Sequence, residues 1–334
     1  MNKTLRNSIL IGITTIIICF VVGCFAFEGK EKTRNIENIP DYYHNILASP
    51  YIPVSISFAE EPVPLDVYWV RENLDKELII TCYQHSRTLQ TIKRSPRFFP
   101  VIEKILNEEG VPEDFKYLCV AESGLENVVS PAKAAGYWQF LASTGKSYGL
   151  IINEEVDERY DLEKSTRAAC QYLKDAKKRL GSWTMAAAAY NMGEAGVKRS
   201  MDSQQIYSYW DLYLNQETAR YIYRILAYKL VFEHPQQYGV KLTKADLYYP
   251  VPVYEHKVTA SIPDLYQFAM DKNITYRELK TLNPWMRSTK LTLNPARYTI
   301  KLPETAKTNY IDLLQNIDKP YQLIGDSVFH VKKH

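Results

Sequence analysis

The sequence is poor in cysteine, and its few cysteines form no pattern. Five occur in 334 residues, and Cys19 and Cys24 fall in the apolar N-terminal segment. The others, Cys82, Cys119 and Cys170, are an odd number without close spacing, which excludes a complete disulfide framework. Cys119 and Cys170 stand at apolar helix positions, so we predict that they are buried free thiols.

Histidine and net charge are also scarce. No two of the six histidines have metal-ligand spacing: His44, His85, His234, His256, His330 and His334. We therefore predict no metal and no cofactor. The formal net charge is only +3 and no nucleic-acid-binding motif is present, so nucleic acid is not expected as a partner.

The length and composition are those of a globular protein with more than one module. A chain of 334 residues is too long for one small domain and predicts two modules with tails. The 26 tyrosines against 11 phenylalanines are unusual. Tyrosine suits sugar binding and also helix packing beside water, and we favour packing for most of these residues.

The N-terminus carries an export signal, which we place at residues 1–27. Lys3 and Arg6 precede an uncharged stretch from Asn7 to Phe27. The stretch is long enough to remain as a membrane-spanning helix. Alternatively, Val21-Val22-Gly23-Cys24 is similar to a bacterial lipobox, with cleavage and lipidation at Cys24, and this interpretation is favoured. Either outcome places the protein in the cell envelope, on the periplasmic side and anchored to the membrane.

A polar tether and a helical body follow. Residues 28–60 are polar with several prolines and predict a tether. Residues 61–245 show helical periodicity and predict a compact all-α domain. The expected helices are bounded by glycine, proline and serine signals: 98–109, 113–123, 162–180, 183–190 and 217–232.

After Pro250 the texture changes to a small α+β module at residues 252–304. Val258 lies in a strand-like piece, and Ser261 and Thr275 are candidate caps of two short helices. Residues 298–303 alternate like a strand and end at proline. The predicted order is βααβ, and residues 305–334 are expected to be a loosely ordered tail.

Glu122 is the candidate catalytic residue. It lies near a helix end, one turn after Leu118 and Cys119 on the same apolar face. A carboxylic acid in such a place tends to keep its proton near neutral pH, as a general acid must. An isolated glutamate at a helix end more often points into water, so the surrounding motifs decide between the two.

Four motifs surround Glu122 in a fixed order: Glu122-Ser123-Gly124, Gly136-Tyr137-Trp138-Gln139, Ala189-Tyr190-Asn191-Met192-Gly193 and Glu217-Thr218-Ala219-Arg220-Tyr221. With them, residues 60–240 resemble the lytic transglycosylases of the goose-type lysozyme superfamily, in the membrane-bound murein transglycosylase D-like branch. The resemblance implies a lysozyme-like all-α catalytic domain. The stretch from Glu122 to Gly136 is one residue shorter than in that family, which makes the place of Ser130 less certain.

The resemblance also implies the reaction and its substrate, the glycan strands of peptidoglycan. Glu122 would protonate the oxygen between N-acetylmuramic acid and N-acetylglucosamine, and the muramic acid C6 hydroxyl would attack C1. Glu122 would then take back the proton, and the product would be a 1,6-anhydro sugar. The acetamido group of the substrate would replace the second carboxylate of other glycosidases. No second acid stands out near Glu122, because Glu126 lies beyond the helix-breaking Gly124.

Other site residues follow from their places in the motifs. Ser130 and Gln139 are expected to bind substrate, with the Gln139 amide orienting acetamido or lactyl groups. Tyr190 is expected to direct its hydroxyl toward Glu122 or the substrate, although an aromatic residue on an alanine-rich helix can simply be core. Asn191 is expected to brace the loop or bind sugar.

Glu217 and Tyr221 stand one turn apart on one helix face, and the resemblance places both near the cleft. For Glu217, a structural ion pair with an arginine is a close alternative. Trp138 is predicted to pack rather than to bind sugar.

The module at residues 252–304 resembles a degenerate LysM domain, a small peptidoglycan-binding fold. The resemblance is carried by the βααβ order, by Leu282-Asn283-Pro284 and by the closing Tyr298–Pro303 stretch. It implies a second contact with the cell wall. A small packing domain without a ligand is the alternative.

Two other functions remain open. A goose-type lysozyme would hydrolyse the same bond with water and would leave a reducing end instead of an anhydro end. A cell-wall-binding scaffold with an inactive cleft is disfavoured by the intact set of Glu122, Gln139, Tyr190 and Asn191. A monomer is expected.

Overall fold

The computed structural model describes residues 48–293, 298–315 and 317–325. The chain divides into two compact units, residues 1–48 and 49–334. The predicted export segment, its lipobox and most of the tether lie outside the described residues. No helix among the described residues has the length and apolar character needed to cross a membrane.

The larger unit begins with a body of helices, as predicted. Its elements in chain order are β1 (Ser57–Phe58), β2 (Glu61–Pro62), α2 (Tyr68–Tyr83), α3 (His85–Glu108), α4 (Phe115–Ser123), α5 (Ala142–Ser147), η2 (Glu158–Tyr160), α6 (Leu162–Leu180), α7 (Trp183–Met192), α8 (Glu194–Gln204), η3 (Tyr209–Asp211), α9 (Gln216–Glu233) and η4 (Lys244–Asp246). β1 and β2 pair antiparallel. The mainly helical fold class is therefore confirmed.

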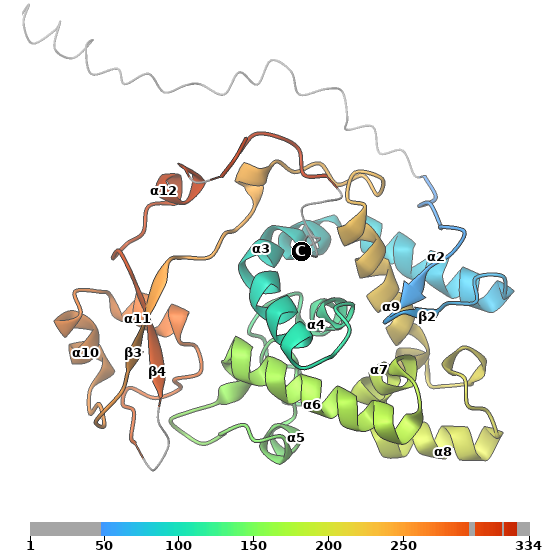
Figure 1. The fold of residues 1–334 in the computed structure, drawn as a ribbon, viewed down its shortest axis with the longest axis horizontal. Coiled ribbons are helices and arrows are strands. Elements are labelled where there is room, and N and C mark those ends of the chain that lie inside the picture. Colours follow the sequence, from blue (N-terminus) through green and yellow to red (C-terminus); the bar gives the residue numbers. More distant parts are fainter. Residues whose placement is uncertain (1–47, 294–297, 316, 326–334) are drawn as a thin grey trace, which may run out of the picture. The chain divides into compact units, whose positions relative to one another are not determined.

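Helix α4 is buried on all of its faces. Every residue from Phe115 to Ala121 is buried, including Lys116, whose ammonium group donates to Glu103 at 2.7 Å. The helix lies between α3 and α9 and contacts both (Figure 1). A helix with apolar residues all round is stable only inside the core. The fold therefore carries the end of α4, with Glu122, into the protein interior.

Helix α6 begins and ends as predicted, and α7 begins as predicted but ends at Met192 instead of Tyr190. The prediction for α3 is wrong at its start, because this helix begins at His85 and runs through Pro96 and Pro100. Asp161 caps α6 by accepting a hydrogen bond from the backbone N–H of Lys164, and Gly181 ends α6 at a φ of 94°. Ser182 caps α7 by accepting from the N–H of Met185. The alanines of α7, residues 186–189, are fully buried. Their small side chains let the neighbouring helices approach closely.

The C-terminal module has the predicted βααβ order. Its elements are β3 (Val253–Lys257), α10 (Leu265–Asp271), α11 (Tyr276–Leu282) and β4 (Thr299–Pro303). β3 and β4 pair antiparallel, with Val253 opposite Pro303. Thr275 caps α11 as predicted, in a reciprocal capping box with Glu278.

The other predicted cap of the module is wrong. Asp264, and not Ser261, caps α10, because its carboxylate accepts from the N–H groups of Tyr266 and Gln267. The Ser261 hydroxyl instead accepts from the N–H of Leu293 in a later loop. A sequence contact that spans 32 residues carries no local signal.

The ends of the catalytic body extend beyond the predicted limits. Phe58, placed in the predicted tether, is fully buried, and the Lys229 ammonium group donates to the Ser57 carbonyl at 2.9 Å. The predicted tail is also ordered where it is described. It forms α12 (Tyr310–Gln315), and the N–H of Ile324 then donates to the carbonyl of Leu242 at 2.8 Å. Isolated contacts with distant residues hold the tail in place. Such contacts leave no periodic pattern in the sequence, so the order of the tail could not be predicted.

The cysteine prediction is confirmed for the described residues. Cys82, Cys119 and Cys170 are free, and Cys119 and Cys170 are buried. Burial raises the pKa of the Cys170 thiol to about 12, so this thiol stays protonated.

Gly136 tests how closely two loops pack. A Cβ atom there would lie 1.8 Å from the backbone oxygen of Arg159, and the φ of Gly136 is 83°. We expect Gly136→Ala to lower the free energy of unfolding by roughly 3 kcal/mol or more, because backbone must move. Urea unfolding measures the change. The control is Gly149→Ala, at a similar φ of 85° but with open space around it. It should cost only about 1 kcal/mol. Equal losses would contradict the close packing.

Candidate active site

The end of α4 is fixed by its own polar groups. Gly124 follows the helix in the left-handed conformation at a φ of 63°. The Ser123 hydroxyl donates to the Cys119 carbonyl at 3.2 Å and accepts from the N–H of Leu125. The Arg94 guanidinium donates to the carbonyl of Gly124. Together these bonds hold Glu122 at the last turn of a buried helix.

Glu122 is partly exposed, and its carboxyl group is held by α9. The Tyr221 hydroxyl donates a hydrogen bond to Oε1 of Glu122. Tyr221 itself is almost fully buried. The phenol of Tyr221 therefore sets the direction of the Glu122 carboxyl group.

Burial raises the pKa of Glu122 to about 7, against an ordinary value of 4.5. Desolvation is the main cause, and the nearby charge of Glu217 adds to it. The hydrogen bond from Tyr221 and the positive charge of Arg224 act in the opposite direction. Near neutral pH the group therefore exists in both protonation states, which suits a residue that gives and then takes a proton.

Tyr190 faces the same interior. Its hydroxyl donates to the Trp138 carbonyl at 2.7 Å, and its ring makes edge contacts with Trp138, Phe140 and Tyr172. Burial raises the pKa of Tyr190 well above its ordinary value, and the charge of Glu122 raises it further. Tyr190 thus lies near Glu122. It also has a packing role, because its ring contacts three aromatic rings and its hydroxyl bonds to a backbone carbonyl. Trp138 is fully buried, as predicted.

Gln139 is turned differently from our expectation. Its amide nitrogen donates to the carbonyls of Val128 and Gly136, at 3.0 and 2.7 Å. Gln139 also adopts a φ of 50°, which is uncommon for this residue type. The amide N–H groups therefore hold the loop together, and only the amide oxygen is left to meet a ligand.

Ser130 lies in a tight turn of the same loop. Its hydroxyl accepts from the N–H of Ala134 at 3.1 Å, and its carbonyl accepts from the N–H of Lys133 at 2.8 Å. These bonds give Ser130 a structural role in the turn. Direct substrate binding by Ser130 and Gln139 stays a prediction.

Asn191 connects two helices. Its side-chain oxygen accepts a hydrogen bond from the Thr218 hydroxyl at 2.8 Å, which joins the end of α7 to the start of α9. This is the bracing alternative of the prediction. Glu217, beside Thr218, is exposed and takes part in no salt bridge within the described part of the chain. Its closeness to Glu122 is seen in the pKa of that group.

Two functional neighbours were missed from the sequence. Arg224, one turn after Tyr221, places a positive charge near Glu122 and lies 3.8 Å from Glu77. Glu77 is almost fully buried on α2 and also pairs with Arg220. Arg224 could have been found from the sequence, because it stands three residues after Tyr221 and so shares its helix face. No such signal marks Glu77, because α2 and α9 are far apart in sequence.

The next carboxylate along the chain after Glu122 is not available for catalysis. Glu126 forms a salt bridge with Arg94. The described residues contain no group of three or more histidine, cysteine, aspartate or glutamate side chains that could hold a metal ion.

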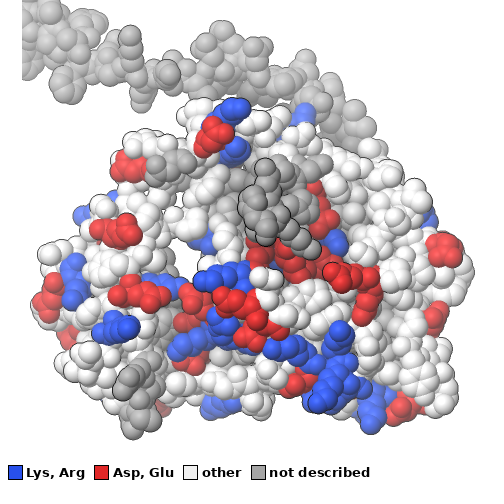
Figure 2. Space-filling model, in the orientation of Figure 1, with Lys and Arg blue, Asp and Glu red and all other residues white. Residues whose placement is uncertain are grey.

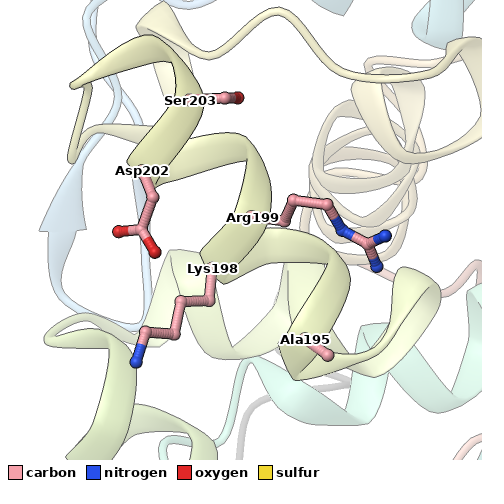
Figure 3. A pocket seen from close by; sticks show the side chains of 5 residues that line it. All are labelled: Ala195, Lys198, Arg199, Asp202 and Ser203. Carbon is pink, nitrogen blue, oxygen red and sulfur yellow. The ribbon is translucent and has the colours of Figure 1, made fainter.

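Two hollows on the surface are lined by residues other than those of the candidate site. One of about 560 Å³ is lined by one helix, α8, at Ala195, Lys198, Arg199, Asp202 and Ser203. Figure 3 shows Lys198 and Arg199 pointing away from each other, so these groups do not converge on a ligand. Another, of about 350 Å³, lies in the C-terminal module beside Phe268 and Asp271.

Surface charge does not mark the site either. Figure 2 shows acidic and basic side chains interspersed on one face, with basic groups gathered along its lower edge, where Figure 1 draws α6 and α8. On α6, Lys174 pairs with Glu109, and Arg179 pairs with Glu194. Such exposed pairs contribute little to stability and indicate a solvated face.

The helical body and the βααβ module define a class of protein. Residues 99–213 match the transglycosylase SLT domain, and residues 254–306 match the soluble lytic transglycosylase C-terminal LysM-like domain. The chain therefore carries a lytic transglycosylase domain of the SLT type followed by a LysM-like domain. Both parts of the resemblance are confirmed.

Two named relatives match part of the chain, and one of them carries a transglycosylase name. The chain is homologous to the membrane-bound lytic murein transglycosylase D of Escherichia coli strain K12, at 29% identity over 238 residues. It is 26% identical over 117 residues to an Alteromonas sp. protein named for tributyltin chloride resistance. These matches cover 69% and 34% of this chain. They cover 51% and 56% of the two relatives, so the chain spans about half their length.

The hydrogen bond from Tyr221 can be tested through the pH profile. Because this bond lowers the pKa of Glu122, Tyr221→Phe should raise that pKa. A general acid works only while protonated, so kcat/KM should fall at a higher pH in the variant, by roughly one pH unit. The control is Tyr223→Phe on the same helix, and its profile should match the wild type. A shift to lower pH would contradict the assignment.

Glu122 should also make stability depend on pH. Its pKa is raised in the folded state, so its contribution is complete at low pH and is lost as pH rises from 4.5 to about 7. Glu122→Gln carries no charge at any pH. It should raise the free energy of unfolding by up to about 3 kcal/mol at pH 8 and change it little at pH 4. Urea unfolding at both pH values measures this. Glu126→Gln is the control and should show no gain at pH 8.

Proposed function

We propose that this protein is a peptidoglycan lytic transglycosylase that uses Glu122 as its single general acid and base. The observation that carries the proposal is the Glu122 carboxyl group, which has a pKa of about 7 at the end of a buried helix and receives a hydrogen bond from Tyr221. The SLT-type domain and the murein transglycosylase relative support it.

The proposed reaction moves one proton twice. Protonated Glu122 gives its proton to the oxygen between N-acetylmuramic acid and N-acetylglucosamine, and the bond from C1 to this oxygen breaks. The acetamido group of the muramic acid stabilises the positive charge at C1. The C6 hydroxyl of the same sugar then bonds to C1 and gives its proton to the Glu122 carboxylate. A 1,6-anhydro end forms, water is not consumed, and Glu122 returns to its starting state.

The surroundings of Glu122 suit both steps. Desolvation keeps a large fraction of the group protonated near neutral pH, as the first step requires. Tyr221 and Arg224 stabilise the carboxylate that acts as the base in the second step. A pKa near 7 balances the two demands.

Hydrolysis of the same bond, as in a goose-type lysozyme, is the second candidate. Glu217 favours it, because this exposed carboxylate lies near enough to Glu122 to raise its pKa. In an inverting glycosidase, a second carboxylate activates water on the opposite face of the sugar. The two functions differ in their products, an anhydro end or a reducing end.

The other proposals concern location and binding. We place the enzyme in the cell envelope, on the periplasmic side, with the segment at residues 1–27 as a lipid or helical anchor. The relative's printed name, which calls it membrane-bound, supports an anchor. The LysM-like module would give a second contact with glycan strands, and a monomer suffices for the reaction.

Digestion of purified sacculi tests the reaction. Wild-type protein should release muropeptides with anhydro ends, and Glu122→Gln should release less than about one thousandth as much, because the general acid is gone. Mass spectrometry separates anhydro from reducing ends. The control is Glu126→Gln, which should keep most of the activity.

Two results would overturn the proposal in different ways. Equal release by wild type and Glu122→Gln would remove Glu122 from catalysis. Reducing ends in place of anhydro ends would make the protein a hydrolase, and Glu217→Gln should then lose activity as well.

A further inference from the structure

The segment between α5 and α6 lies between the Gln139 loop and the C-terminal module. We call residues 151–161 the connecting segment and residues 128–140 the site loop. The connecting segment contacts the module on one side and the site loop on the other. Figure 1 draws it beside the module, at the start of α6.

The module side of the connecting segment is a short β-like pairing. Val156 and Met286 form an antiparallel bridge. The N–H of Asp157 donates to the Trp285 carbonyl at 2.9 Å, and the N–H of Arg287 donates to the Glu155 carbonyl at 2.7 Å. Backbone pairing of this kind fixes the relative position of two chain segments.

The Glu155 side chain strengthens this pairing. Its carboxylate accepts from the N–H of Thr292 at 2.8 Å and pairs with the Lys290 ammonium group at 3.1 Å. The Glu155 carboxylate therefore binds two residues of the module, Thr292 and Lys290.

The other side of the connecting segment is held by Arg159. Its guanidinium donates to the backbone carbonyls of Lys133 and Phe140, at 3.0 and 3.1 Å, and both belong to the site loop. Asp157 pairs with the same guanidinium at 2.7 Å and fixes its direction. The pair is nearly buried, with 11% and 10% of the Arg159 and Asp157 side chains exposed. A charged group bonded to one carbonyl inside a loop and to another at its end holds these two parts of the loop together.

A shared apolar cluster joins all three parts. Ala135 of the site loop and Val156 and Tyr160 of the connecting segment belong to the same cluster as the core of the module. The guanidinium of Arg287, from the module, lies 4.2 Å from the centre of the Tyr160 ring. Ala135 has 1% of its surface exposed. The core of the module therefore includes a residue of the site loop itself.

We propose that the C-terminal module braces the active site, and that Arg159 is the positioning residue that transmits this brace to the site loop. The proposal rests on the proposed function, because the site loop matters only if Glu122 acts beside it. The loop contains no helix or strand, apart from two isolated bridges. Hydrogen bonds within the loop shape its turns, and its placement against the rest of the protein depends on contacts from outside. Docking of the module supplies them and keeps the Trp138 carbonyl in reach of Tyr190, next to Glu122.

The test uses the full-length protein and breaks each side of the connecting segment in turn. Arg159→Met removes the bonds to the site loop. Glu155→Arg places a positive charge against Lys290 and weakens the module side. The control is Arg167→Met on α6, which removes a guanidinium paired with Glu108 and Glu109 away from both loops.

Amide hydrogen exchange and steady-state kinetics are measured for each variant. Peptides from residues 128–140 should exchange about tenfold faster in Arg159→Met and in Glu155→Arg, with α9 unchanged. On the same sacculi, kcat should fall roughly tenfold or more with a smaller change in KM, because a misplaced site costs rate. Adding Lys290→Glu to Glu155→Arg restores an ion pair and should move both quantities back toward the wild type.

The outcomes separate the brace from the reaction. Unchanged exchange of residues 128–140 in both variants would overturn the proposal. Faster exchange in Arg159→Met alone would limit Arg159 to local loop structure and would overturn the role of the module. The exchange measurement needs no activity, so it still decides if the wild type yields no anhydro product and the proposed function fails.

Discussion

The candidate site depends on the hydrogen bond that the Tyr221 hydroxyl donates to the Glu122 carboxyl group. A carboxyl group at the end of a fully buried helix must either stay protonated or find a donor that tolerates its charge. Glu122 does both in part: it keeps its proton up to a higher pH than usual, and it has Tyr221 as a donor. Desolvation raises the pKa of Glu122 to about 7, while Tyr221 and Arg224 limit the rise. The balance leaves a group that can release and recover a proton under the same conditions.

This balance has a cost in stability that the rest of the fold offsets. Helix α4 is buried on every side, and its one lysine, Lys116, is paired with Glu103. Arg224 also approaches buried Glu77, so the positive charge near Glu122 is itself held by a partner on α2. Buried charges remain acceptable when each has a partner. The electrostatics of Glu122 therefore extend across two helices that are distant in sequence.

The site loop shows how an irregular segment is kept in one shape. Its carbonyl groups receive hydrogen bonds from the side chains of Gln139, Tyr190 and Arg159, each from a different direction. Backbone carbonyls inside a protein must be satisfied, and in this loop side-chain donors add to the backbone hydrogen bonds that do so. Polar residues of a catalytic motif can thus serve the backbone first. Gln139 was expected to orient substrate through its amide, but its amide nitrogen donates hydrogen bonds to two carbonyls of the loop.

Local patterns in the sequence determined several helices, such as α6, and the order of the module, but they missed the start of α3 at His85. Gly181 and Thr275 act where the sequence places them, because capping depends on a few neighbouring residues. The ordered motifs also pointed to Glu122 as the candidate catalytic residue, and that role stays a prediction.

Only the tertiary structure decided the state and surroundings of Glu122. Its partner Tyr221 lies 99 residues away, and desolvation depends on everything packed around both. The hydrogen bond between Ile324 and Leu242 and the two hydrogen bonds from Arg159 to the site loop likewise join residues that are distant in sequence. Periodicity in a sequence reports which face a residue occupies, whereas the distance and solvent access of a polar group are set only when distant segments meet.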